Sequence, residues 1–264
     1  MKSIIQRVGE HGLDVLKKYP VRQFLVIALA GSQNYGLDTE NSDVDTKMLI
    51  IPTLGDISMN REPVSKTSIR ENSEHTDIKD YRLYFNTLKK QNPNFVEILF
   101  TDYYVVNPEY QAEWDELIAI REQIARLNPH KTISSMRGIV HQKYKQFANE
   151  NSIRGDLVKK YGYDGKQAYH LLRIENFIDK YIKNVDYTVA LRPEEELREK
   201  LFDYKLNKVP FTEAKVEMER VYNKVTKLTE EYLVKNPSIN DIETEKEMDL
   251  IAYEILKKSL RKEI

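Results

Sequence analysis

The chain has no cysteine and almost no net charge. Its 264 residues include 41 basic and 42 acidic side chains, which gives a formal net charge of −1 at pH 7. The absence of cysteine excludes disulfide bonds, thiolate metal sites and cysteine nucleophiles. Because the charges balance, attraction to a nucleic acid would have to come from a local basic surface rather than from the whole molecule.

Long apolar segments are also lacking. The longest run, near residues 24–30, is far too short to cross a bilayer, which takes about 20 apolar residues in a helix. Residues 1–6 lack the apolar core of a secretory signal. We therefore expect a soluble, cytoplasmic protein with no membrane partner. A chain of this length can bury a sizeable core, in one large domain or two small ones.

A turn of small residues follows the first apolar run. Phe24–Ala30 has the length and composition of a buried strand. Gly31 then allows a sharp turn, Ser32 adds a hydroxyl and is a natural N-cap, and Gly36 offers the same backbone freedom again. Such a turn can direct backbone N–H groups at an anion, so the pattern predicts a phosphate-binding turn.

Two acidic residues stand just before the next apolar stretch. Asp43 and Asp45 precede Met48–Ile51, and in an extended chain both side chains point to one face, with α-carbons about 7 Å apart. Two carboxylates at that spacing can converge on Mg²⁺, a hard cation that prefers oxygen ligands shared with substrate phosphates. The alternative is a simple polar turn over residues 41–43, although a turn does not require a second acid inside the strand.

Together, Gly31-Ser32 and Asp43-x-Asp45 resemble the signature of the DNA polymerase β-like nucleotidyltransferase superfamily. The first half follows a predicted strand and the second half opens another, as in that superfamily. The resemblance implies that the Gly-Ser turn holds a nucleoside triphosphate, ATP or another, and that the acids bind Mg²⁺, with two ions expected.

The superfamily also uses a third carboxylate, and three candidates lie close together: Glu74, Asp77 and Asp80. We favour Asp77, because its neighbours are typical of a strand, whereas Asp80 is placed as the N-cap of a helix over residues 81–90. Its expected role is to help hold the metal and to orient or deprotonate the attacking hydroxyl. A solvent-facing strand residue is the alternative for Asp77.

The first part of the chain alternates helices and strands. Residues 53–73 carry turn formers and mixed charge, so we expect a loop or excursion that is able to cover the active site. Helices are expected over 4–18, over 80–90 and from Asn92 through Phe100. Strands are expected over 24–30, over a segment that runs up to residue 52, over 64–69, around residue 77 and over 103–106.

From residue 108 onward, apolar residues recur with the period of a helix. Helices are expected over 108–126, 130–149, 165–184, 193–206, 211–235 and 240–262. The predicted fold class is therefore α+β: a small mixed β-sheet nucleotidyltransferase core flanked by helices, followed by an all-helical domain. We place the catalytic domain at 1–115 and the helical domain, which contributes to nucleotide and acceptor binding, at 116–264.

The helical part contains a second group of polar residues. A helix beginning at Asp164 or Gly165 places Lys166, His170 and Arg173 on one face, at i, i+4 and i+7. Three stacked basic side chains are more favourable with an anion between them, and the triphosphate is the obvious candidate. The alternative is two surface charges and a buried, hydrogen-bonded histidine. The residues alone leave both open.

Residues 162–173 are similar to the helical-half signature of the RlaP-like, RNA-repair-associated predicted nucleotidyltransferases. Residues 92–100 are similar to that family's Asn-Pro-x-x-x-Glu-x-Leu segment, and the resemblance extends from about residue 23 to about residue 220. Gln167 stands where the family has a histidine, so it is assigned no role. Membership implies nucleotidyl transfer but does not identify the acceptor.

The acceptor therefore stays open. A hydroxyl at an RNA end, a protein side chain or a small molecule would each fit, and a non-catalytic, antitoxin-like nucleotide-binding module is a further alternative that the intact acid pair disfavours. The chain has 17 tyrosines, and several stand beside lysines, as over 141–145 and 159–161. This interleaving suits base stacking on RNA, or an amphipathic helix with tyrosines toward the core.

Overall fold

The computed structural model describes residues 3–38 and 42–263. The chain divides into two compact units: Met1–Asn128 with Asn240–Ile264, and Pro129–Ile239. The predicted boundary at 115/116 falls inside helix α5 (Gln111–Ala119), and the last helix, α13 (Ile242–Leu260), belongs to the first unit because it packs against α5. Asn41, part of the alternative polar turn, lies outside the described residues.

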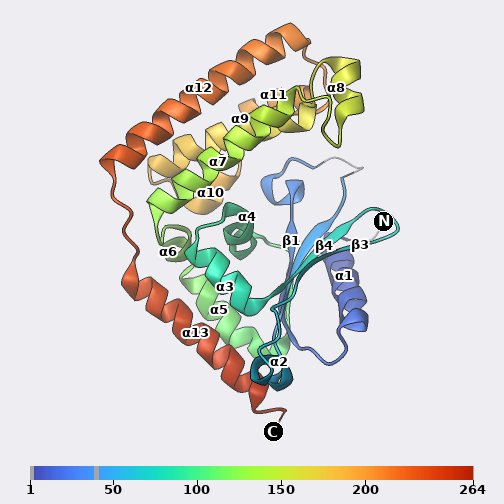
Figure 1. Ribbon diagram of the computed structural model, residues 1–264, viewed down its shortest axis with the longest axis vertical. Coiled ribbons are helices and arrows are strands. Elements are labelled where there is room, and N and C mark those ends of the chain that lie inside the picture. The colour runs from blue at the N-terminus through green and yellow to red at the C-terminus, as the bar shows by residue number, and fades with distance from the viewer. Residues whose placement is uncertain (1–2, 39–41, 264) are drawn as a thin grey trace. The chain divides into compact units, whose positions relative to one another are not determined.

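The first unit contains a mixed sheet with the strand order β3-β4-β2-β1-β5 (Figure 1). β2 and β4 are parallel, and the other neighbouring strands are antiparallel. The α+β prediction is confirmed. The strands are β1 (Phe24–Ala30), β2 (Asp45–Ile50), β3 (Ser65–Ile69), β4 (His75–Asp80) and β5 (Tyr104–Val106).

Helices surround this sheet and make up the second unit. Those of the first unit, besides α5 and α13, are α1 (Ile4–Lys18), η1 (Ser32–Tyr35), α2 (Leu54–Ser58), α3 (Tyr81–Lys89), α4 (Pro93–Val96), η2 (Glu97–Phe100), η3 (Pro108–Tyr110) and α6 (Arg121–Ala125). Those of the second are α7 (Pro129–Phe147), α8 (Gly155–Tyr161), α9 (Gly165–Ile182), α10 (Tyr187–Leu191), α11 (Glu195–Lys205) and α12 (Phe211–Lys235). No helix in residues 3–38 and 42–263 is long and apolar enough to cross a bilayer.

Three predictions of local structure need correction. The single helix expected from Asn92 through Phe100 is the short helix α4 followed by the 3₁₀ helix η2. The single helix expected over 108–126 is three short ones, since Ile120, with φ −103° and ψ 15°, ends α5 and precedes α6. The loop expected over 53–73 also contains α2, which Thr53 starts by accepting a hydrogen bond from the Asp56 N–H. A one-turn helix of this kind depends on its cap rather than on apolar periodicity.

The α1 side of the sheet carries an apolar core cluster. Val8 and Val15 of α1 pack with Ile27, Met48 and Ile50, all buried. Figure 1 shows α1 on one side of the sheet and α3, α5 and α13 on the other. Because side chains alternate along a strand, the residues between these apolar positions on β2 face away from α1.

A buried polar network also lies on the α1 side. The Nδ1 atom of His11 is 3.0 Å from the Thr46 hydroxyl, and its Nε2 atom is 2.9 Å from Glu74 Oε2. The other oxygen of Glu74 accepts a 3.2 Å hydrogen bond from the N–H of Val44. Val44 is the residue between the two predicted metal-binding acids, so Glu74 holds the backbone that carries them.

A second buried carboxylate holds β2 from the opposite side. Lys47 lies 3.4 Å from Glu97, and their side chains are only 9 % and 8 % exposed. The Tyr35 hydroxyl, at the end of η1, also donates to Glu97. Glu97 therefore ties the acid-bearing strand to the turn that follows β1.

We predict that His11 makes the protein less stable in mild acid. Burial, together with the charges of Arg70 and Arg7, lowers the pKa of His11 to about 4. An unfolded histidine has a pKa of about 6.5. Below pH 6.5, His11 therefore binds a proton in the unfolded chain but not in the folded one. Between pH 7 and pH 5 this should cost about 2 kcal/mol of unfolding free energy.

Urea unfolding at pH 7, 6 and 5 measures this loss. A His11→Gln variant should show a flatter pH dependence than the parent protein, whereas His75→Gln, at an exposed position, should keep the parent's dependence. Equal slopes for the parent and His11→Gln would contradict the assignment.

We also predict that Glu97→Leu alone destabilises the protein by about 3 kcal/mol, because it leaves the buried Lys47 ammonium without its partner. The double variant Lys47→Met/Glu97→Leu should recover most of that loss, since apolar replacement of both partners of a buried pair is often neutral. Denaturant unfolding of the parent protein, the single variant and the double variant checks this. A double variant as unstable as the single one would argue against the pair.

Candidate functional site

The turn after β1 is built on Gly31. Its φ of +92° is in a region that side chains disfavour, and Gly36, with φ +65°, closes the turn. Ser32 was expected as the N-cap, but the structure gives that position to Gly31. Ser32 is the first residue of η1. The glycine conformation turns the chain one residue earlier than a serine cap would.

Asn34 fixes the conformation of this turn. Its Nδ2 donates a 2.9 Å hydrogen bond to the carbonyl oxygen of Leu29, and its Oδ1 accepts a 2.6 Å bond from the Thr101 hydroxyl. Sequence reasoning missed Asn34. The available signal was an asparagine between two glycines, a residue that commonly hydrogen-bonds its own turn.

Asp45 lies directly beside the turn. It pairs with Ala30 across the sheet, and a Cβ built on Gly31 would be 3.9 Å from its Oδ2. Its Oδ1 accepts a 3.2 Å hydrogen bond from the N–H of His75. Asp43 lies two residues before β2 begins, with an exposed side chain. Gly31 and Asp45 are thus brought together, and Asp43 lies near them in the chain.

Asp77 is on the same face as Asp45. The parallel register pairs Lys47 of β2 with Asp77 of β4, so Asp45 and Asp77 are diagonal neighbours with α-carbons about 8 Å apart. Asp77 is half-buried, and its Oδ1 accepts a 2.7 Å hydrogen bond from the Thr67 hydroxyl.

The other two third-acid candidates have structural roles. Glu74 points to the opposite face of the sheet from Asp77 and is buried on the α1 side with His11. Asp80 is fully buried and caps α3, accepting a 3.0 Å hydrogen bond from the N–H of Arg82, as the sequence indicated. Of the three, Asp77 is the one that lies on the same side of the sheet as Asp45.

The described residues contain no group of three or more acidic, histidine or cysteine side chains already arranged to hold a metal. The donor chemistry of Asp43, Asp45 and Asp77 nevertheless fits Mg²⁺, which takes oxygen ligands and usually completes its shell with substrate phosphates and water. The two strand acids supply carboxylate oxygens from neighbouring strands, beside a turn without a side chain at Gly31.

The second unit carries the other predicted site residues. As expected, Asp164 starts α9, and its carboxylate accepts a 2.9 Å hydrogen bond from the N–H of Lys166. Gly165 is required for packing, because a side chain there would collide with the backbone carbonyl of Tyr204 at the end of α11. The Asp-Gly pair of the motif therefore sets where α9 begins and how closely α11 approaches it.

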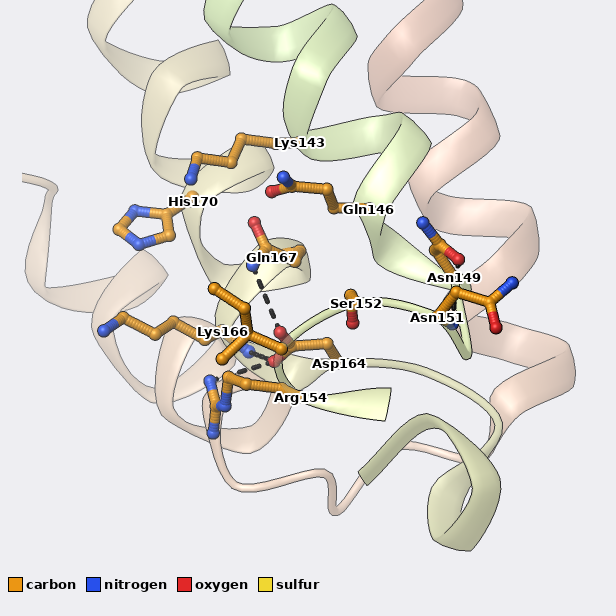
Figure 2. A pocket seen from close by; sticks show the side chains of 11 residues that line it. Lys143, Gln146, Asn149, Asn151, Ser152, Arg154, Asp164, Lys166, Gln167 and His170 are labelled. Carbon is orange, nitrogen blue, oxygen red and sulfur yellow. Dashed lines mark hydrogen bonds and ion pairs between the residues drawn. The ribbon is translucent and has the colours of Figure 1, made fainter. Parts of the chain in front are cut away.

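Lys166 and His170 line a cavity of about 490 Å³ within this unit (Figure 2). Arg173 is not among the lining residues, but its charge acts on His170 and on Lys143. The complete lining is Lys143, Gln146, Asn149, Asn151, Ser152, Ile153, Arg154, Asp164, Lys166, Gln167 and His170.

His170 does not act as a third cation in this cavity. Burial, reinforced by Arg173, Lys143 and Lys166, lowers the pKa of His170 well below its usual value. The imidazole is therefore neutral at pH 7, and it offers hydrogen bonds rather than charge. In the predicted phosphate site, His170 would therefore take part as a neutral hydrogen-bonding group beside Lys166 and Arg173.

Lys143 is a cavity residue that sequence reasoning did not assign. Burial lowers the pKa of Lys143, and the neighbouring Lys166 lowers it further. It lies in the tyrosine-lysine segment 141–145, where Tyr144 stacks on Tyr222 of α12 at 4.3 Å. That contact favours the amphipathic interpretation for Tyr144, while Lys143 points to the cavity in Figure 2.

Comparison with known proteins assigns the chain to a family. Residues 9–177 match the model of a family described as RlaP, the RNA repair pathway DNA polymerase beta family. None of the curated proteins compared with the chain matches it. The match covers the sheet, the acids and the start of the helical unit, and it supports a nucleotidyltransferase-like role. The chain therefore belongs to the RNA repair pathway DNA polymerase beta family.

Proposed function

We propose that this protein is a Mg²⁺-dependent nucleotidyltransferase that moves a nucleoside monophosphate from a nucleoside triphosphate, ATP foremost, to a hydroxyl acceptor. The observation that carries the proposal is the position of Asp45. Its carboxylate lies beside Gly31. It also shares a face of the sheet with Asp77, which lies on the neighbouring strand β4. Turn and acids thus form one local group.

Each residue is proposed to act in a defined way. Gly31 leaves room for a phosphate to approach the backbone, and Ser32 adds a hydroxyl donor. Asp43, Asp45 and Asp77 would hold Mg²⁺, which when bound neutralises phosphate charge and makes the acceptor hydroxyl more acidic. In the second unit, Lys166, His170 and Arg173 are proposed to bind nucleotide phosphates.

Asp77 is also proposed to receive the proton. Thr67 holds one of its carboxylate oxygens at 2.7 Å, which orients the other toward the acceptor. The acceptor oxygen would attack the α-phosphorus in line, the bond from that phosphorus to the bridging oxygen would break, and pyrophosphate would leave with the electron pair.

We favour an RNA end as the acceptor, because the family description names RNA repair. Transfer of AMP to a protein or a small molecule is the competing function. The buried glutamates beside β2, Glu74 and Glu97, both position that strand and are assigned no catalytic role.

A labelling experiment tests the proposal. Protein with Mg²⁺ and α-labelled ATP is offered total RNA, cell protein and metabolites in parallel. We expect label on RNA, and at least about a 100-fold loss for Asp43→Asn and Asp45→Asn, since each removes a metal-binding charge. Asp115→Asn, an exposed position on α5, is the matched control and should retain activity.

Other results have clear meanings. Label on protein or metabolites would replace RNA as the acceptor. Undiminished label with the Asp43→Asn/Asp45→Asn double variant would overturn the mechanism. No label with any of the four nucleoside triphosphates would leave the non-catalytic, nucleotide-binding alternative.

A further inference from the structure

The cavity of the second unit has two chemically different sides. Lys143, Lys166 and His170 lie on one, and carboxamide side chains, Gln146 and Gln167 among them, lie on the other (Figure 2). Its volume of about 490 Å³ is in the range of small-molecule sites, about 300–1,000 Å³. The cavity can therefore hold a ligand much larger than a single phosphate.

Among the described residues, the one acid in the cavity lining is already bound by other groups. Asp164 is the acid that lines the cavity, but its oxygens are used by the Lys166 N–H at 2.9 Å, the Gln167 amide at 3.1 Å and Arg154 at 2.9 Å. Within the described part of the chain, the ammonium groups of Lys143 and Lys166 have no ion-pair partner. Two neighbouring ammonium groups repel each other, and a phosphate placed between them would remove that repulsion.

The amide of Gln167 has a defined orientation. Its Nε2 donates to Asp164 Oδ2 at 3.1 Å, and because a carboxylate only accepts hydrogen bonds, the amide nitrogen must be the atom that faces it. The carbonyl oxygen, Oε1, then points away from Asp164. It is buried and has no hydrogen-bond partner among the described residues.

A buried carbonyl oxygen without a donor is unfavourable, so this atom favours a ligand with an N–H or O–H group. Ile153 adds an apolar contact at the rim, where its side chain is fully exposed. Phosphate, hydrogen-bond donor and apolar face occur together in a nucleotide, whereas inorganic phosphate or pyrophosphate supplies only the first when fully ionised.

We propose that this cavity binds a nucleotide, with its phosphate between Lys143 and Lys166, a hydrogen bond from His170, and an N–H or O–H of the nucleoside donating to Gln167 Oε1. The ligand class rests on the proposed function, but binding does not require transfer. The nucleotide is either a free nucleoside triphosphate or the terminal nucleotide of an RNA. Lys143 and Gln167 are thus proposed as binding residues in addition to Lys166, His170 and Arg173.

Equilibrium binding in EDTA, where transfer cannot proceed, tests the proposal. Calorimetric titrations with ATP, inorganic triphosphate and a short 5′-phosphorylated RNA are compared for the full chain and its variants. We expect Lys143→Met to weaken ATP and triphosphate binding at least tenfold. Gln167→Leu should weaken ATP binding about tenfold and leave triphosphate binding unchanged. Lys145→Met and Gln142→Leu, exposed positions on α7, should bind like the parent.

The ratio of ATP to triphosphate affinity is measured within one protein, so it remains informative if Gln167→Leu is less stable. An unchanged ratio in Gln167→Leu, or parent-like binding in Lys143→Met, would overturn the proposal. Tighter binding of ATP identifies the free nucleoside triphosphate as the ligand, and tighter binding of RNA identifies the terminal nucleotide of the RNA. The proposed function fails separately, if Asp43→Asn/Asp45→Asn transfers label normally while these affinities behave as expected.

Discussion

The parallel register between β2 and β4 is the constraint on which the candidate site depends. It pairs Lys47 with Asp77 and so puts Asp77 on the face that Asp45 occupies. A shift of one residue would turn Asp77 toward α1. The Thr46 and Thr76 hydroxyls, 2.9 Å apart, hold the two strands in this register on the opposite face.

Two buried glutamates secure the same strand from its two sides. Glu74 binds the N–H of Val44 on the α1 side, and Glu97 binds Lys47 and Tyr35 on the other. A buried carboxylate is stable when its oxygens are paired, and both meet that condition. Through Glu97, the segment over residues 92–100 connects the turn after β1 with β2.

The sequence predicts what local patterns determine. The bounds of β1, α1 and α12 were predicted to the residue, because apolar periodicity and terminal caps are local. The pattern favours Asp77 because its neighbours are typical of a strand, but only strand pairing shows that Asp77, and not Glu74, shares a face with Asp45. Lys143 and Gln167 were missed for a similar reason: α7 and α9 meet in space, and the orientation of an amide depends on its partner.

We propose that Asp45 and Asp77, which share one face of the sheet, bind the same metal ion. The most direct measurement is the rise in thermal unfolding midpoint when Mn²⁺ is added to protein that already holds a non-hydrolysable ATP analogue, since a ligand of the folded state stabilises it. We expect a rise for the parent protein and for Asp115→Asn, and its loss in Asp45→Asn and in Asp77→Asn. An equal rise in all four proteins would contradict it.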